Sequence, residues 1–204
     1  MSQSIYGVYE FALEKVKDQI VTALEGFQEE TQEKTGDNAF EHLLARIKSD
    51  ESMREKCRHK GIAETAENAL KTVRDSIGIR VICSFVDDIY NVRDFLQNLD
   101  GVDIIEEKDY IKHTKPNGYR SYHMILEITT DFPDVTGAFP GKYFVEVQVR
   151  TIAMDTWASL EHKMKYKKDI PNQELLVSEL KRIADELASC DLSMQTIREQ
   201  IENS

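Results

Sequence analysis

The sequence has little cysteine, proline and tryptophan, and it has no long apolar run. Its 204 residues include three cysteines, four prolines and one tryptophan. Cys57, Cys83 and Cys190 show neither a CxxC pair nor Cys/His metal-ligand spacing. This excludes a disulfide framework, so we expect three small, buried or partly buried thiols in a reducing compartment. The apolar stretches are a few residues long, which excludes a membrane-spanning helix.

Several common sequence signals are also missing. The N-terminus lacks a basic segment followed by an apolar run, so we expect no signal peptide and a cytoplasmic protein. The absence of a Walker A sequence and of GxGxxG excludes the usual P-loop and Rossmann sites, and no GxSxG elbow occurs. None of the five histidines is followed by aspartate or shows zinc spacing.

The charge is strongly negative overall but unevenly distributed. The net charge is −11, with acidic residues concentrated in the N-terminal region and the C-terminal tail. Basic residues cluster at 46–60 and 163–168. A globally acidic protein with local cationic patches is more typical of binding to a small anionic ligand than to a polynucleotide.

The pattern of apolar residues predicts helices, then a sheet with interleaved helices, then a final helix. We expect one core of α/β or α+β class, with helical extensions at 1–38 and 171–204 around a domain at 39–170. Thr35 to Asn38 should break the first helix. Further helices are predicted at 39–48, 52–59, 64–73, 87–99 and 151–166, and strands at 77–85, 102–106, 122–128 and 143–149.

The C-terminal tail carries apolar residues at alternating steps of four and three. This is a heptad seam. It predicts either a long helix that packs on its own domain or a contact between subunits. The seam residues are Leu176, Leu180, Ile183, Leu187, Cys190, Met194, Ile197 and Ile201.

The most informative segment is KPNGYRSYH, residues 115–123. A turn between strands needs Pro, Asn and Gly for its backbone geometry. It has no need of Lys115, Tyr119, Arg120 and His123 crowded around them. A phosphate-bearing aromatic ligand would use the cations for its phosphates and the tyrosine face for its base, which favours a binding loop over a decorated hairpin.

Two carboxylates stand at sheet positions. Glu146 and Gln148 share one face of the predicted strand 143–149, with Arg150 beyond them, and Asp75 precedes the strand that starts at 77. Glu146 either faces solvent or holds a cation, because a carboxylate buried without a partner is costly. Asp75 is either an ordinary turn residue or the second ligand of a divalent ion that also binds substrate phosphates.

A cationic stretch, RIKSDESMREK, covers residues 46–56. Arg46 and Lys48 would lie at the end of the helix predicted at 39–48, while Ser52 and Lys56 would be i,i+4 neighbours on the next helix. Ser52 is either a simple N-cap or part of a phosphate cradle made of cations and a helix N-terminus.

Five ordered motifs together resemble the RelA/SpoT-type synthetases, specifically the small alarmone synthetases. The resemblance covers about residues 40–168, and the chain lacks the His-Asp motif of the hydrolases. The motifs are RIKSDESMREK (46–56), DSIGIR (75–80), KPNGYRSYH (115–123), EVQVRT (146–151) and WASLEHKMKYK (157–167).

The resemblance implies a nucleotidyltransferase-like fold, with a mixed five-stranded sheet flanked by helices. It also implies a reaction in which ATP donates its β,γ-pyrophosphate to the 3′-hydroxyl of GDP or GTP and AMP is released. The products, (p)ppGpp, are the alarmones of the stringent response. The family's habit of assembling through terminal helices implies a homotetramer, and RNA would enter only as a regulator.

Residue roles follow from the same resemblance. Asp75 and Glu146 would hold Mg²⁺, and Glu146 would also be a candidate to take the proton of the attacking hydroxyl, although a metal-bound carboxylate is a poor proton acceptor. The donor ATP would be bound by Arg46 and Arg80 around the adenine and by Lys48, Ser52 and Lys56 at the phosphates. The acceptor would meet Tyr119 and Asn117 at the guanine and Lys112, Lys115, His123 and Gln148 at the phosphates or ribose.

One departure and two alternatives stay open. Asp50 and Glu51 stand inside the cationic stretch, where many relatives carry a proline and fewer charges; they either weaken ATP binding or point outward. The same catalytic residues would serve an adenine nucleotide or the 3′ end of tRNA as acceptor, although tRNA needs a basic surface that the net charge disfavours. A catalytically silent regulator would be expected to lack Asp75 or Glu146.

Overall fold

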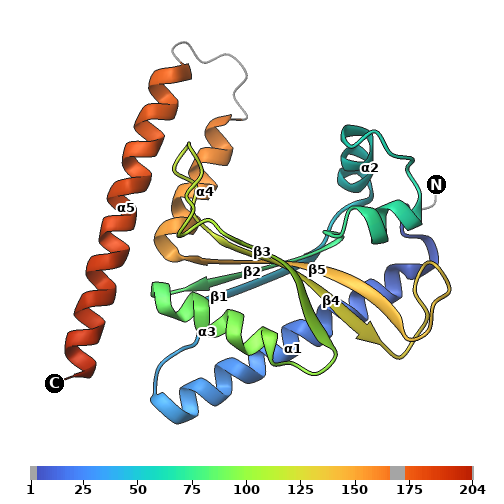
Figure 1. The fold of residues 1–204 in the computed structure, drawn as a ribbon, viewed down its shortest axis with the longest axis horizontal. Coiled ribbons are helices and arrows are strands. Elements are labelled where there is room, and N and C mark those ends of the chain that lie inside the picture. Colours follow the sequence, from blue (N-terminus) through green and yellow to red (C-terminus); the bar gives the residue numbers. More distant parts are fainter. Residues whose placement is uncertain (1–3, 166–172, 204) are drawn as a thin grey trace.

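Five strands form one sheet at the centre of the structure, a computed structural model that describes residues 4–165 and 173–203. They are β1 (His42–Ile47), β2 (Ile77–Cys83), β3 (Val102–Asp109), β4 (Tyr122–Thr130) and β5 (Gly141–Thr151). The order across the sheet is β1-β2-β5-β4-β3, as Figure 1 shows. Only β2 and β5 run parallel; the other neighbours are antiparallel. This confirms the predicted mixed five-stranded sheet.

Helices cover one face of the sheet and border the other. They are the 3₁₀ turn η1 (Gly7–Tyr9), α1 (Glu10–Thr35), α2 (Asp50–His59), the π-helical turn η2 (Asn68–Thr72), α3 (Val86–Gln97), α4 (Ile152–Lys165) and α5 (Gln173–Glu202). In Figure 1, α1 and α3 lie below the sheet, whereas α2 and α4 stand above it at opposite ends. A pocket lined by residues of β1, β2 and β5 keeps the upper face between α2 and α4 open.

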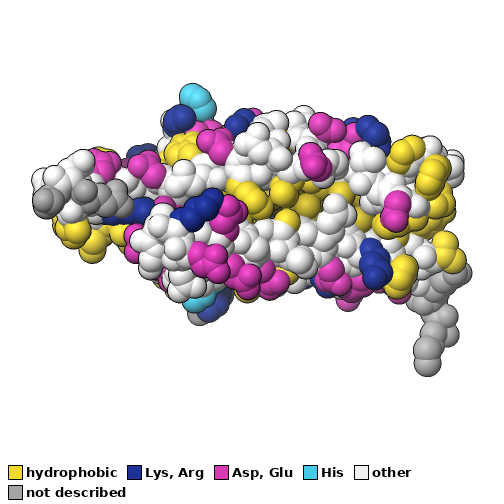
Figure 2. Space-filling model, turned by 90° about the horizontal axis from the view of Figure 1, so that it is seen from below, with side chains coloured by type: hydrophobic (Ala, Val, Ile, Leu, Met, Phe, Trp, Pro, Cys, Tyr) yellow, Lys and Arg dark blue, Asp and Glu magenta, His cyan; other side chains and the backbone are white. Residues whose placement is uncertain are grey.

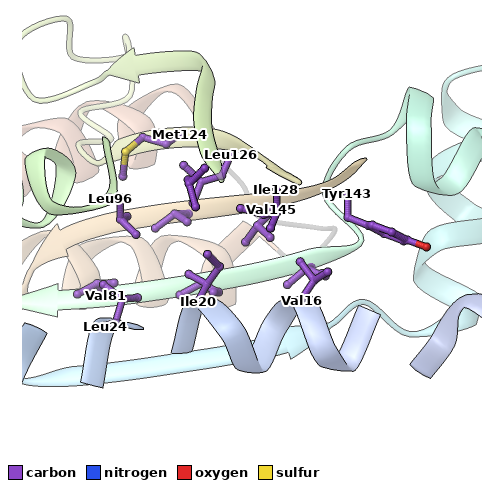
Figure 3. Close-up of a cluster of buried hydrophobic side chains, with 14 of the residues drawn as sticks. Val16, Ile20, Leu24, Val81, Leu96, Met124, Leu126, Ile128, Tyr143 and Val145 are labelled. Atoms are coloured by element: carbon purple, nitrogen blue, oxygen red, sulfur yellow. The ribbon is translucent and has the colours of Figure 1, made fainter. Parts of the chain in front are cut away.

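The core lies between α1, α3 and the lower face of the sheet. Figure 3 shows Val16, Ile20 and Leu24 of α1 pointing toward Val81 and Val145 of the central strands. These five side chains are almost fully buried. Burial of each contributes about 1.5–3 kcal/mol relative to exposure. The apolar stripe of α1, repeating at three and four residues, therefore belongs to the main core.

The prediction of a helix at residues 39–48 is wrong, because residues 42–47 form the edge strand β1. Arg46 consequently lies within a strand, opposite Gly78 of β2, and not at a helix end. Leucine, alanine and arginine all favour helices. Here the backbone pairing with β2 and the alternating burial along β1 override that local preference.

Most other elements agree with the sequence, with shifted boundaries. The first helix ends at the predicted break, where Gly36 adopts φ 81° and its N–H donates to Gln32 O at 2.9 Å. The helix predicted at 52–59 begins at Asp50, with Ser49 and not Ser52 as its N-cap. The helix predicted at 64–73 contains the π-helical turn η2, and β3, β4 and β5 are longer than expected.

The C-terminal helix α5 packs on α4 through Leu176, Leu180 and Leu187 of its seam, whereas Ile183 is exposed. Leu180 is buried beside Trp157, whose indole N–H donates to Leu180 O at 2.8 Å. The second half of the seam is exposed; Met194, Ile197 and Ile201 keep 51–70% of their accessible surface. Cys190 is exposed as well, which corrects the expectation of a partly buried thiol, whereas Cys57 and Cys83 are buried.

The molecular surface carries charges of both signs. Figure 2, which views the structure from the α1 and α3 side, shows acidic and basic side chains interspersed, with hydrophobic side chains between them. Among the described residues, no helix is long and apolar enough to cross a membrane.

Candidate active site

The open face of the sheet forms the floor of a pocket of about 350 Å³. Strand register brings alternate residues of β1, β2 and β5 into rows on this face: Arg46 lies opposite Gly78, and Gly78 opposite Glu146. Arg80 lies opposite Gln148 in the next row. A Cβ on Gly78 would meet nothing within 4 Å, so the floor is open at its centre. The lining residues are Leu44, Ala45, Arg46, Gly78, Ile79, Arg80, Glu146 and Gln148.

Asp75 anchors two lysines at the edge of this pocket. Its carboxylate is buried, and Oδ2 accepts hydrogen bonds from Lys48 Nζ at 2.6 Å and from Lys56 Nζ. Its Oδ1 is buried without a hydrogen-bond partner among the described residues. Burial lowers the pKa of Lys48, against the opposing effect of Asp75. The site thus has lysines on one oxygen of Asp75 and an unsatisfied acceptor on the other.

The first turn of α2 adjoins this cradle. Ser49 caps the helix by accepting the N–H of Ser52 at 3.3 Å, and its hydroxyl also donates to Ser52 Oγ at 2.9 Å. Ser52 is exposed. Asp50 accepts hydrogen bonds from Ile5 N and from Arg54 Nε, so its carboxylate is engaged in protein contacts. The exposed Ser52 is therefore available to a ligand at the helix N-terminus.

Arg80 is held in place by a carboxylate that sequence reasoning missed. Asp155 Oδ1, at the start of α4, lies 3.3 Å from Arg80 Nη1 and accepts a hydrogen bond from Arg150 Nη1 at 2.9 Å. Burial, followed by the neighbouring Arg150, lowers the pKa of Arg80. Asp155 therefore holds two arginines at one end of the pocket.

Arg150, buried near the end of β5, also connects this end of the pocket to Gln148 and Tyr119. It donates to Gln148 Oε1 at 2.9 Å and to the Tyr119 hydroxyl at 2.7 Å. Sequence reasoning noted Arg150 but gave it no role. Glu146, Gln148 and Arg150 are two residues apart along the strand, and this spacing indicates that all three side chains lie on the same face.

Tyr119 and His123 form a hydrogen-bonded pair that lies beside Glu146. The Tyr119 hydroxyl lies 2.8 Å from His123 Nε2. Because the Arg150 guanidinium only donates, the hydroxyl proton is available to Nε2, which favours the tautomer with hydrogen on Nδ1. That Nδ1 lies 3.9 Å from Glu146 Oε1. Burial, then the charges of Arg150 and Lys115, lower the pKa of His123 to about 3, so the ring is neutral at pH 7.

The loop that precedes β4 presents Tyr119 between cations and other aromatic rings. Lys115 Nζ lies 4.9 Å from the Tyr119 ring centroid and 4.4 Å from that of Tyr110. Asn117 shapes the loop: its Oδ1 accepts the N–H of Tyr119 at 3.2 Å, and its Nδ2 donates to Glu161 at 3.1 Å. The sequence motif thus forms a built loop beside the pocket.

Lys112 is not brought together with these residues. Its Nζ lies 3.5 Å from Asp109 Oδ2 and 4.8 Å from the Tyr90 ring centroid. Lys108, which sequence reasoning did not select, is paired in register with His123 across β3 and β4. Tyr166 and Lys167, the last residues of the fifth motif, lie outside the described residues.

Comparisons with known proteins agree with this geometry. Residues 45–171 match the family model described as "Region found in RelA / SpoT proteins". GTP pyrophosphokinase YwaC of Bacillus subtilis (strain 168) is 39% identical over 197 residues, which cover 96% of this chain and 89% of YwaC. GTP pyrophosphokinase YjbM of the same strain is 32% identical over 165 residues, 81% of this chain and 75% of YjbM.

Solved structures give the same result. Small alarmone synthetase 2 from Bacillus subtilis matches with a TM-score of 0.78 and 38% identity, over 94% of this chain and 98% of that one. Small alarmone synthetase 1 from Bacillus subtilis, bound to its product pppGpp, matches with a TM-score of 0.77 and 30% identity, over 95% of this chain and 94% of that one.

The sheet, its open charged face and these matches define a class of single-sheet, nucleotide-dependent pyrophosphokinases. Within that class, the chain belongs to the RelA/SpoT family. The resemblance stated from the five motifs is confirmed.

Proposed function

We propose that this protein is an ATP:GDP/GTP 3′-pyrophosphotransferase that makes (p)ppGpp. The observation that carries the proposal is the placement of Glu146. It lies on the open sheet face, in the pocket that Arg46 and Arg80 line and near the Tyr119–His123 pair. A donor bound on one side and an acceptor on the other would meet at this carboxylate.

The donor half is assigned to the two arginines that line the pocket and to the lysines on Asp75. Arg46 and Arg80 would lie against the adenine, since guanidinium groups stack well on flat rings. Lys48, Ser52 and Lys56 would bind the ATP phosphates. The short helix α2 adds its N-terminus, where backbone N–H groups favour anions.

Mg²⁺ fits the carboxylates of the site. Asp75 Oδ1 is a buried acceptor without a hydrogen-bond partner among the described residues, and Glu146 lies on the adjacent side of the Gly78 floor. No cluster of three or more metal-ligating side chains occurs in the described part of the chain. Mg²⁺ is usually held by one or two carboxylates together with substrate phosphates, which matches this donor set. When bound, it would neutralise charge on the transferring group.

The acceptor half is assigned to the loop at 115–123. Tyr119 would stack on the guanine with the help of Asn117, and Lys115 would bind phosphate after leaving the Tyr119 ring. His123 and Gln148 would meet the ribose or phosphates, whereas Lys112, which lies against Asp109 and Tyr90, is left out of this assignment. Neutral His123 suits hydrogen bonding to a ribose better than ion pairing with phosphate.

The proposed transfer needs no covalent intermediate with a protein side chain. Phosphoryl-type transfer needs in-line positioning and stabilisation of spreading negative charge. Lys48 and Lys56 supply positive charge beside Asp75, and Glu146 is assigned to metal binding before any role as a base. A metal-bound carboxylate is a poor proton acceptor.

The cellular context is part of the same proposal. We propose a cytoplasmic homo-oligomer, a tetramer by family resemblance, in which residues 1–38 and 171–204 are extensions of a synthetase domain at 39–170. RNA would act only as a regulator.

The test is an acceptor panel. Purified protein with Mg²⁺ and γ-labelled ATP would be offered GDP, GTP, ATP and bulk tRNA in separate reactions, with products resolved by chromatography. We expect label on GDP or GTP. Label on tRNA or on an adenine nucleotide would keep the chemistry but refute the alarmone product. Binding of ATP without transfer to any acceptor would indicate a silent regulator.

A further inference from the structure

The first described residues of the chain pack directly against the donor half of the site. Ile5 and Tyr6 are 5% and 2% exposed, whereas most residues of the neighbouring helix α2 are exposed or half-buried. The Tyr6 hydroxyl donates to the backbone oxygen of Lys48 at 2.8 Å, over a sequence separation of 42 residues. The buried Tyr6 therefore contacts the backbone of the lysine assigned to the ATP phosphates, in addition to packing in the core.

Lys48 is consequently held at both of its backbone polar groups. Its N–H donates to Ser76 O at 2.8 Å, next to Asp75, and its carbonyl accepts the Tyr6 hydroxyl. These two bonds fix both peptide planes at the corner between β1 and α2. The side chain of Lys48, which ends on Asp75, is aimed by this corner.

A second contact ties the same segment to α2. Ile5 N donates to Asp50 Oδ1 at 2.5 Å, while Asp50 Oδ2 accepts Arg54 Nε at 2.9 Å. Helix α2 has ten residues and buries Met53 and Cys57, and the Ile5–Asp50 bond adds to the ion pairs that its side chains make with Glu64 and Asp75. Asp50, an acid inside the cationic stretch, is thus engaged by the N-terminal segment and by Arg54.

We propose that Tyr6 is a positioning residue for the ATP site, acting through the backbone of Lys48, with the Ile5–Asp50 bond holding the same corner. This inference rests on the assignment of Lys48 to the ATP phosphates. Burial and the nearby Asp75 carboxylate raise the pKa of Tyr6, so its hydroxyl stays protonated and remains a donor at working pH.

The experiment is Tyr6→Phe, which keeps the ring and removes the hydroxyl. Binding of α,β-methylene-ATP with Mg²⁺, and of GDP, would be measured by calorimetry, alongside thermal unfolding. We expect the dissociation constant for the ATP analogue to rise about three- to tenfold, the effect of losing one positioning hydrogen bond. GDP affinity should stay within twofold of the parent protein.

Tyr143→Phe is the matched control. Its hydroxyl also donates to a backbone carbonyl, that of Pro133, at 3.0 Å. Tyr143 lies in β5, in the main core, and its hydroxyl does not donate to Lys48. The substitution should cost similar stability and leave the affinity for the ATP analogue unchanged. An equal loss of analogue affinity in both variants, or a lower unfolding temperature of Tyr6→Phe with unchanged affinity, would overturn the proposal.

The measurement separates this inference from the proposed function. A parent protein that binds the analogue but transfers nothing would refute the pyrophosphotransferase activity, while the effect of Tyr6→Phe on binding would still support the positioning role. A parent protein that does not bind the analogue would refute both.

Discussion

At the scale of single residues, Asp75 is the most constrained group in the site. One carboxylate oxygen carries two lysines, and the other is buried without a hydrogen-bond partner among the described residues. A buried acceptor left unsatisfied costs about 1–3 kcal/mol. A site that tolerates this cost in the resting protein is well suited to bind a cation there in the working one.

Asp75→Asn should therefore lose activity while keeping the fold. The amide preserves shape but removes the charge that a cation needs, and we expect kcat/KM to fall about 100-fold or more. The measurement is steady-state transfer over a range of Mg²⁺ concentrations, with thermal unfolding as the control for folding. Normal activity in this variant would exclude the metal assignment.

Tyr119 permits a sharper test, because its ring and its hydroxyl have separate partners. Tyr119→Ala should raise the KM for the acceptor about tenfold or more, since base stacking contributes about 1–3 kcal/mol. Tyr119→Phe keeps the ring and loses only the hydrogen bonds of the hydroxyl to Arg150 and His123, so it should have a smaller effect on that KM. An increase in the KM for ATP, with the acceptor KM unchanged, would contradict the assignment of Tyr119.

At the scale of elements, the sequence predicted the central strands β2 and β5 but not the edge strand β1. The β-branched and alternating stretches of β2 and β5 indicated strands, and the shared face of Glu146 and Gln148 follows from a two-residue period. The strand β1 was missed because its identity depends on pairing with β2 and not on local preference. That error placed Arg46 at a helix end, whereas the structure has it within the sheet, opposite Gly78.

The contact between α5 and the acceptor loop is another feature that spacing did not reveal. Gly118 adopts φ 92°, and a Cβ there would lie 2.6 Å from the Cβ of Ala184. Arg120 adds a bond to Asp185 at 2.9 Å. The loop that presents Tyr119 therefore packs against the C-terminal helix. A change in α5 should alter the affinity for the acceptor.

Gly118→Ala should show this coupling. The strained φ and the clash with Ala184 should cost about 2 kcal/mol of the free energy of unfolding, and the acceptor KM should rise. Urea unfolding and steady-state kinetics check the two effects. Gly26→Ala is the control: Gly26 lies in α1 with nothing within 4 Å of a Cβ, and alanine should stabilise that helix by up to about 1 kcal/mol. Stability equal to the parent protein in Gly118→Ala would contradict the account of this contact.

At the scale of the whole molecule, one buried carboxylate links the end of the sheet to η2. Asp134 accepts hydrogen bonds from Lys71 Nζ, from both the backbone and the hydroxyl of Thr136, and from Lys142 N. Burial opposes its ionisation, but these bonds together outweigh that effect and hold the pKa of Asp134 below its usual range. The loop 131–140 is fixed by this residue.

The sign of the pH dependence follows from that lowered pKa. The unfolded chain binds a proton at Asp134 near pH 4, before the folded protein does, so the stabilisation is complete above about pH 4 and is lost as the pH falls further. Asp134→Asn should lower the free energy of unfolding by about 2–4 kcal/mol at pH 7. In urea titrations, the difference from the parent protein should shrink below pH 4. A difference that stays constant down to pH 3 would contradict this account.

The assembled site shows what a sequence can and cannot indicate about a whole molecule. Asp75, Tyr119 and Glu146 were selected because their residue types are costly or unnecessary for structure alone. Asp155 and Tyr6 were not, because an aspartate at a helix start and a tyrosine near a terminus are ordinary in sequence. Their partners, Arg80 and Lys48, are 75 and 42 positions away along the chain. Such pairings exist only in the folded chain.

The central claim is that this protein transfers a pyrophosphate group from ATP to a guanosine nucleotide. The most direct test measures the adenine product of a reaction with GDP and Mg²⁺, together with the mass of the guanosine product. The account predicts one AMP released for each guanosine nucleotide that gains two phosphates. Release of ADP with gain of one phosphate, or no change in GDP while ATP is consumed, would contradict it.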